Sequence, residues 1–220
     1  MLPNLPYNIS QGVRGMNKVE NTTLDNILKE AKIEFMDKGY QNASLRVIVK
    51  KAGVTTGAFY GYYKNKAQLF DALVEEQYDY TIKLYKDTLD EFFSSTPEEQ
   101  SINMIEITYK CMSKLKDYMY ENFDVFKMIL CCSEGTKYKH MIHEMAEMDI
   151  QATRNFSKTI AQVLEGTKEV NPVLEHILTS GMFTGFFELV VHNVPREEAD
   201  EYINQLLEFY SAGWGKIMGF

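Results

Sequence analysis

The chain has 220 residues, of which 45% are hydrophobic and 25% are charged, and its formal net charge is −8. This length allows one small and one larger domain with a substantial core. The acidic balance argues against nucleic-acid binding by the chain as a whole. The longest apolar stretch, residues 181–191, contains Glu188 and is too short to span a bilayer.

The charge is distributed unevenly along the chain. Residues 1–70 hold ten Lys and Arg against five Asp and Glu, a balance of +5. Residues 71–220 hold thirteen against twenty-six, a balance of −13, so the two parts together give −8. The basic N-terminal part is therefore where a nucleic-acid contact is expected. The acidic part either repels DNA and orients docking or is an ordinary solvated surface.

Five prolines and the lack of long alternating stretches predict an all-α fold. Residues 1–20 contain two prolines and two glycines and lack the apolar stretch of a signal peptide. We expect them to form a mostly disordered extension, followed by a DNA-binding domain over 21–70 and a larger helical domain over 71–220.

The first predicted helix, around residues 24–39, has apolar residues at steps of three and four, and Gly39 suits its C-terminal end. A second helix begins after Ser44, a good N-cap residue, and ends at a tight turn at Gly53. Thr55 or Thr56 then caps a third helix. Two short helices joined by a tight turn are typical of a helix-turn-helix.

Three sequence pieces strengthen this interpretation. They read I-L-K-E-A-K-I-E-F-M-D-K-G-Y (27–40), A-S-L-R-V-I-V-K-K-A-G-V (43–54) and T-T-G-A-F-Y-G-Y-Y-K-N-K-A-Q-L-F (55–70). Together they resemble the DNA-binding domain of tetracycline-repressor-type (TetR-family) transcriptional regulators. Ala58 lacks the hydroxyl that is often found at its position in the family, and Gly61 replaces a larger side chain, so the base preference is open.

Residues of the second and third helices and of the following helix start are the predicted DNA contacts. Hydroxyls, tyrosines and basic side chains suit phosphates and base edges, and a glycine lets the backbone approach closely. Tyr63, by contrast, either contacts DNA or packs in the small core, where it takes the place of a phenylalanine. The predicted contacts are Ser44, Arg46, Thr55, Thr56, Gly57, Tyr60, Tyr62, Lys64 and Lys66.

Six further helices are predicted, over about 66–93, 97–120, 123–132, 137–164, 172–192 and 196–218. The last two are the predicted dimerisation helices, because the final one carries a narrow apolar stripe of the coiled-coil type and the one before it carries close-packing glycines. The alternative is that these stripes cover the core of their own subunit. The predicted interface residues are Leu178, Met182, Gly185, Phe186, Leu189, Ile203, Leu207, Tyr210, Trp214 and Ile217.

The central helices are predicted to enclose a ligand cavity. Twelve methionines are many for this length, and flexible thioethers adapt to varied apolar ligands. At any single position, a methionine or aromatic residue on an apolar stripe is more often ordinary core. The predicted ligand contacts are Tyr109, Met112, Phe126, Met145, Met148, Phe183 and Phe187.

One competing constellation is H-M-I-H-E-M-A-E at 140–147, in which His140 and Glu144, or His143 and Glu147, share a helix face. This spacing suits a divalent metal and suggests a metal-dependent helical enzyme as an alternative function. The order H-E-x-x-H of a zinc protease is absent, and surface salt bridges explain the pattern better. Cys111, Cys131 and Cys132 have no metal-ligand spacing. We therefore predict no metal site, no cofactor and no catalytic activity.

The sequence thus predicts a cytoplasmic, homodimeric, ligand-responsive regulator that binds double-stranded operator DNA, most naturally as a repressor released by a small-molecule effector. A further alternative is an architectural DNA-binding protein without an effector. No membrane association is expected.

Overall fold

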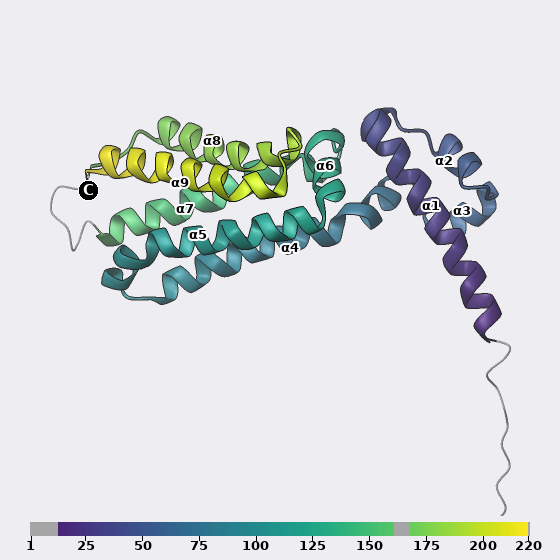
Figure 1. Cartoon of the computed structure of the whole chain (residues 1–220), viewed down its shortest axis with the longest axis horizontal. Coiled ribbons are helices and arrows are strands. Elements are labelled where there is room, and N and C mark those ends of the chain that lie inside the picture. Colours follow the sequence, from purple (N-terminus) through teal and green to yellow (C-terminus); the bar gives the residue numbers. More distant parts are fainter. Residues whose placement is uncertain (1–12, 161–167, 220) are drawn as a thin grey trace, which may run out of the picture. The chain divides into compact units, whose positions relative to one another are not determined.

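A computed structural model describes residues 13–160 and 168–219 of the chain (Figure 1). Every regular element in these ranges is a helix, which confirms the all-α prediction. The elements are α1 (Val13–Asn42), α2 (Leu45–Lys51), α3 (Thr56–Tyr62), α4 (Lys66–Ser94), α5 (Pro97–Glu121), α6 (Phe123–Cys132), the 3-10 turn η1 (Lys137–His140), α7 (Met141–Ile160), α8 (Pro172–Val191) and α9 (Arg196–Met218).

The chain divides into two compact units, Met1–Leu73 and Val74–Phe220. The first contains α1 to α3 and the first turns of α4, and the second contains the rest of α4 and all later helices. α1 begins at Val13, inside the segment expected to be an extension, so the first helix is longer than the sequence suggests. Residues 1–12 lie outside the described part.

The first unit is built around the apolar face of α1. Ile27, Ala31 and Phe35 recur every four residues and are fully buried. The ring of Phe35 meets that of Phe70 edge to face, with centroids 5.0 Å apart. Ile48 of α2 and Phe59 of α3 complete the same core, with exposures of 0% and 1%, and Leu69 and Phe70 of α4 are also fully buried. One small apolar cluster therefore holds four helical segments together.

Local signals explain most helix ends. Thr96 and Glu99 form a reciprocal capping box at the start of α5, and Asn171 accepts hydrogen bonds from the first turn of α8. Gly39 has φ 69°, but it kinks α1 rather than ending it, because the backbone resumes helical geometry as far as Asn42. Ser44 occupies the N-cap of α2 without a side-chain cap bond. Its backbone N–H instead donates to the buried carboxylate of Glu34, at 3.3 Å.

In the second unit, α8 packs against α6, α7 and α9, and Figure 1 shows α8 and α9 side by side. Phe183, Phe186 and Phe187 of α8 are each no more than 1% exposed. Phe183 meets Tyr85 of α4 edge to face at 5.2 Å, and Phe187 stacks with Phe126 of α6 at 6.5 Å. A helix that is apolar on most sides must be covered on most sides, so α8 organises this unit.

The predicted helix over 137–164 is divided in the structure, because η1 precedes α7 and residues 161–167 lie outside the described part. In the described ranges, no helix is both long enough and apolar enough to cross a membrane.

Candidate functional site

The segment from α2 to α3 forms a helix-turn-helix. Gly53 follows α2 with φ +70°, a left-handed conformation that a glycine adopts without strain. The backbone N–H of Val54 donates to the carbonyl of Val49 at 3.2 Å and closes the turn. Thr55, rather than Thr56, then caps α3, because its Oγ1 accepts a hydrogen bond from the N–H of Ala58 at 3.1 Å.

α3 presents most of its surface to solvent. Only Phe59 is buried, and its ring packs against those of Tyr60 and Tyr63 at centroid distances of 5.4 and 6.0 Å. Burial raises the pKa of Tyr63, which agrees with its packing role. Tyr60 and Tyr62 are 56% and 38% exposed. The exposed face of this short helix is therefore polar and aromatic, which suits contact with a polar surface.

A shallow groove runs between α2 and α3. It is lined on the α2 side by Arg46 and Lys50 and on the α3 side by Thr55, Thr56 and Tyr60. All five are exposed. Lys50 was absent from the sequence-based contacts, although it lies one turn after Arg46 and the helical period of 3.6 residues predicts that they share a face.

The remaining predicted contacts differ in their surroundings. Gly57 and Lys64 are exposed, whereas Ser44 is half-buried. The ammonium of Lys66 donates to the carbonyls of Gln41 and Ala43 at 3.0 and 3.1 Å and lies over the ring of Tyr40. Lys66 thus ties the start of α4 to the C-terminal end of α1. Lys66 was predicted to contact DNA; in the structure its ammonium is held by these two carbonyls.

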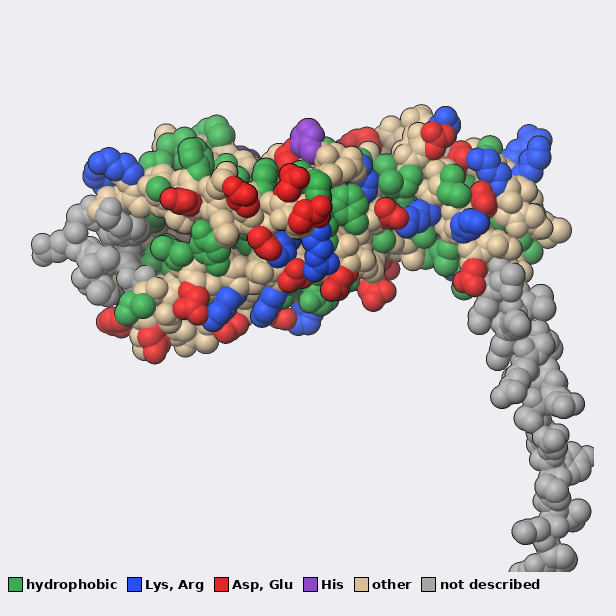
Figure 2. Space-filling view, in the orientation of Figure 1, with side chains coloured by type: hydrophobic (Ala, Val, Ile, Leu, Met, Phe, Trp, Pro, Cys, Tyr) green, Lys and Arg blue, Asp and Glu red, His purple; other side chains and the backbone are tan. Residues whose placement is uncertain are grey.

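Basic side chains gather around this groove. Arg46, Lys50, Lys51 and Lys64 are all exposed, and Figure 2 shows Lys and Arg side chains over this unit. Lys51 lies 3.8 Å from the buried Glu34 carboxylate, so part of its charge is compensated within the unit. Arg46 and Lys50 remain the cations directed at the groove.

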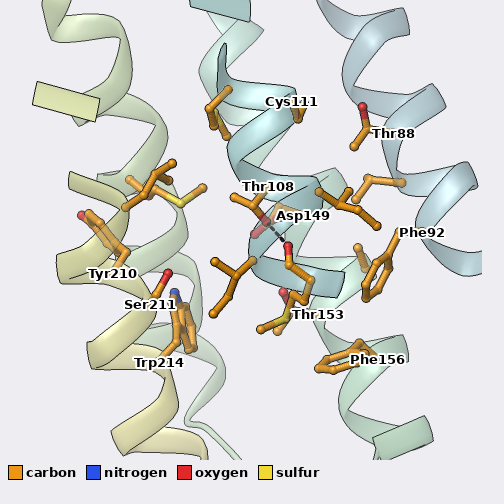
Figure 3. Close-up of a pocket in the computed structure, with 18 of the residues that line it drawn as sticks. Thr88, Phe92, Thr108, Cys111, Asp149, Thr153, Phe156, Tyr210, Ser211 and Trp214 are labelled. Carbon is orange, nitrogen blue, oxygen red and sulfur yellow. Dashed lines mark hydrogen bonds between the residues drawn. The ribbon is translucent and has the colours of Figure 1, made fainter. Parts of the chain in front are cut away.

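The second unit contains a cavity of about 580 Å³ bounded by α4, α5, α7, α8 and α9. In Figure 3, Thr88 and Phe92 approach it from α4, and Tyr210 and Trp214 approach it from α9. Most of the lining is apolar or aromatic. The polar lining residues are Tyr85, Thr88, Thr108, Asp149, Thr153, Tyr210 and Ser211.

Asp149 is the carboxylate of this cavity. Its Oδ1 accepts a hydrogen bond from the hydroxyl of Tyr85 at 2.5 Å. Burial raises the pKa of Asp149 to about 6; the Tyr85 hydrogen bond opposes this shift and the charge of Glu175 adds to it. Burial likewise raises the pKa of the Cys111 thiol in the same lining. The cavity thus contains a carboxylate that is poorly solvated.

Comparison with known proteins identifies the first unit. Residues 27–73 match the family model described as bacterial regulatory proteins, tetR family. The Tn10 TetC protein of Escherichia coli is 45% identical over 56 residues, which are 26% of this chain and 28% of that protein. The HTH-type transcriptional regulator YdgC of Bacillus subtilis is 24% identical over 191 residues, 82% of this chain and 89% of that protein.

Residues 27–73 thus form a DNA-binding domain of the tetR family. The chain is a DNA-binding transcriptional regulator with an N-terminal helix-turn-helix unit and a larger helical C-terminal unit. The fold is also that of NalD, the secondary repressor of the MexAB-OprM multidrug efflux pump in Pseudomonas aeruginosa. NalD has a TM-score of 0.54 and 17% identity, over 87% of this chain and 96% of NalD.

The cavity of this regulator includes only Met112 of the seven predicted ligand contacts. Phe126, Met145, Phe183 and Phe187 are no more than 1% exposed and lie in the core outside the lining. Met148 is half-buried, and Tyr109 donates to the carbonyl of Asn204 at 3.4 Å; neither lines the cavity. Periodicity identified apolar helix faces, but the faces around α6 and α8 are filled by aromatic side chains.

The sequence carries a signal for Asp149 that the prediction missed. Met145, Asp149, Ala152 and Phe156 are spaced by four, three and four residues, so an acidic residue interrupts the apolar stripe of α7. A carboxylate on a buried face indicates either a paired charge or a functional group.

The predicted dimer stripes of this regulator face its own interior. Met182, Phe186, Leu189, Ile203 and Leu207 are buried. Tyr210 and Trp214 line the cavity, while Leu178 and Ile217 are half-buried. The five buried side chains are therefore covered within their own subunit, as the alternative expects, while the dimer interface itself stays a prediction.

The two glycines of α8 serve the same packing. A Cβ at Gly185 would lie 3.2 Å from Cδ1 of Leu206, and one at Gly181 would lie 2.9 Å from the hydroxyl of Tyr210. Both glycines therefore allow α9 to approach α8 within one chain.

The four residues of the competing metal constellation are not brought together as a set. Glu144 accepts a short hydrogen bond from Tyr78. His143 and Glu147 instead lie beside His176 of α8, with ligand atoms all within 4.8 Å of one another. His176 Nδ1 is 3.3 Å from Glu147 Oε1, with both side chains nearly half exposed, so a polar contact at the surface accounts for their proximity.

The raised pKa of Asp149 predicts a pH-dependent stability. The folded chain holds the Asp149 proton more tightly than the unfolded chain does. The stabilisation of the fold by this protonated carboxyl is therefore complete below about pH 4 and is lost as the pH rises through about 6. The side chain of Asp149→Asn cannot ionise. The difference in free energy of unfolding between this variant and the native chain should therefore grow, in favour of the variant, by about 1–3 kcal/mol from pH 4.5 to pH 7.5. Urea denaturation at both pH values measures this, and a constant difference would contradict it.

Proposed function

We propose that this regulator is a cytoplasmic homodimer that represses transcription by binding a palindromic operator and leaves the DNA when a small molecule fills the cavity of the second unit. The observation that carries this proposal is the helix-turn-helix with an exposed polar and aromatic face on α3. NalD, which shares the fold, is a repressor by name, and the same direction of regulation is proposed here. No catalytic step is part of this function.

In the DNA complex, α3 enters the major groove with Thr56 and Tyr60 facing the bases and sugars. Arg46 and Lys50 of α2 line the protein groove between α2 and α3 and contact phosphates or a base edge. Gly57 and Gly61 have no Cβ, and a Cβ built at Gly61 would meet nothing within 4 Å of the protein. The backbone of α3 can therefore approach the DNA closely.

Substitutions in the groove should weaken operator binding. Arg46→Ala and Tyr60→Ala should each cost about 1–3 kcal/mol, or about 5- to 150-fold in affinity, because each removes a contact to a base or the DNA backbone. Lys50→Ala should lower the slope of log K against log salt by about 1. Fluorescence anisotropy with DNA from upstream of the gene and a scrambled duplex measures both effects.

Lys86→Ala is the matched control for charge, because Lys86 is an exposed lysine of α4 in the second unit. It should leave affinity unchanged. Equal affinity of the native, Arg46→Ala and Tyr60→Ala proteins for the upstream DNA would remove the proposed DNA surface. Equal binding of both duplexes would instead favour an architectural role.

Dimerisation is proposed through the outer faces of α8 and α9, in place of the stripes predicted from sequence. Ile177 and Val173 of α8 are 58% and 68% exposed, and Phe209 of α9 is 71% exposed. Large apolar side chains at such exposure on neighbouring helices are typical of an interface. A two-fold axis here would pair two recognition helices, which must lie about 34–36 Å apart to reach successive major grooves.

A charge in this patch should separate the dimer. Phe209→Glu and Ile177→Glu would each place a carboxylate in an apolar interface and should shift the protein to monomer, as measured by sedimentation equilibrium. Ile102→Glu is the control, since Ile102 of α5 is 78% exposed outside this patch. Dimers that survive both substitutions in α8 and α9 would contradict the proposal.

Coupling between ligand and DNA is proposed to run through α4. Its first turns belong to the first unit, and Tyr85, Thr88 and Phe92 of the same helix line the cavity. A ligand that prefers one arrangement of this helix by a few kcal/mol would shift the population away from the DNA-binding form.

A further inference from the structure

We propose that the cavity of the second unit takes a cationic amphipathic ligand, such as a lipophilic quaternary ammonium compound, with Asp149 as its counter-charge. This inference rests on the proposed function, because it names the chemical class of the small molecule that fills the cavity.

The charges around the cavity are unbalanced. Asp149 is an acidic lining residue, and the described residues of the lining include no Lys, Arg or His. Its side-chain partner is the hydroxyl of Tyr85, a neutral donor. The neighbouring carboxylate of Glu175 differs, because Arg154 pairs with it at 2.8 Å. Of the two acidic groups, only Asp149 is left for a ligand to neutralise.

The rest of the lining suits an organic cation. The rings of Phe92, Phe156, Tyr210 and Trp214 line the same space. Aromatic faces attract cations that carry alkyl groups, and this attraction grows when the cation is removed from water. A volume of about 580 Å³ lies in the usual range for a drug-sized ligand. The cavity therefore offers both a counter-charge and apolar surface.

The same arrangement disfavours other classes of ligand. An anionic ligand, such as a fatty acid, would bring a second negative charge next to a poorly solvated carboxylate. A neutral apolar ligand would displace water from Asp149 without replacing its charge. Of these three classes, only a cation is attracted by the negative charge of Asp149 and neutralises it.

Binding of a permanent cation should also depend on pH. The groups facing Asp149 are Tyr85 of α4, Cys111 of α5 and Glu175 of α8, with Arg154 of α7 on Glu175. On the α9 side, Tyr210 lines the same cavity. Since Asp149 has a pKa of about 6, protonation at pH 5 should weaken binding by about tenfold relative to pH 7.5.

Trp214 supplies a direct reporter, because it lines the cavity and is the single tryptophan of the chain. Its fluorescence is followed while the full-length protein is titrated with benzyltrimethylammonium and with its neutral carbon isostere, neopentylbenzene. The neutral dye N-phenyl-1-naphthylamine is titrated separately to report whether the cavity accepts any apolar molecule.

Two variants separate charge from shape. Asp149→Asn keeps the side-chain volume and an oxygen that accepts from Tyr85. Glu144→Gln is the matched control, because it removes the same charge from α7 and keeps a tyrosine partner, Tyr78, while Glu144 is not part of the lining. We expect the cation to bind at least tenfold more tightly than the isostere, and this preference to be lost in Asp149→Asn but kept in Glu144→Gln.

Two failures are distinguishable. If the dye binds but the native protein and Asp149→Asn bind the cation equally, the cavity accepts ligands and the cationic class is wrong. If neither the dye nor the two isosteres alter Trp214 fluorescence, the cavity is no ligand site, and the proposed effector response fails together with the inference.

Discussion

Covering α8 is the constraint on which the second unit depends. This helix carries three nearly fully buried phenylalanines, Phe183, Phe186 and Phe187, and it packs against α6, α7 and α9. Removing so much aromatic surface from water is a large favourable contribution to the stability of this unit. Gly181 and Gly185 allow α9 to come close enough to close one side. The helices around α8 are therefore held mainly by apolar burial.

The cavity forms next to this core, where the packing changes from aromatic to mixed. Threonines, a serine and Asp149 line part of it together with Met112 and Met182. A carboxylate in such surroundings lowers stability, because its charge is poorly solvated. Natural proteins retain such groups where they serve binding or catalysis, and the hydrogen bond from Tyr85 only partly offsets the cost.

The first unit is stabilised differently from the second, because its recognition helix buries little surface. α3 is seven residues long and buries only Phe59, which leaves the rest of its surface for contact. So short a helix is not stable alone and depends on its cap at Thr55 and on the core formed by α1. Lys66 illustrates the interdependence, because a cation that the sequence assigns to DNA also binds the backbone at the C-terminal end of α1.

Local chemistry by itself determined the helices and the helix-turn-helix of this protein. Caps such as Thr55 and Thr96, the left-handed Gly53 and the apolar periods of the helices act over a few residues, so the helix boundaries after Ser44 are readable to within a few residues wherever the structure describes them. The family resemblance over 27–70 rests on the same short range.

Only the tertiary structure decided what each apolar face meets. Periodicity shows that Ile203, Leu207, Tyr210 and Trp214 share one face of α9, but not whether that face meets a second subunit, a core or a cavity. The same limit applies to α7, where Met145 is buried in the core and Asp149, one turn later, lines the cavity. The physical reason is that burial is non-directional: an apolar stripe is stabilised by any partner that excludes water, and the partner is chosen by the packing of the whole unit.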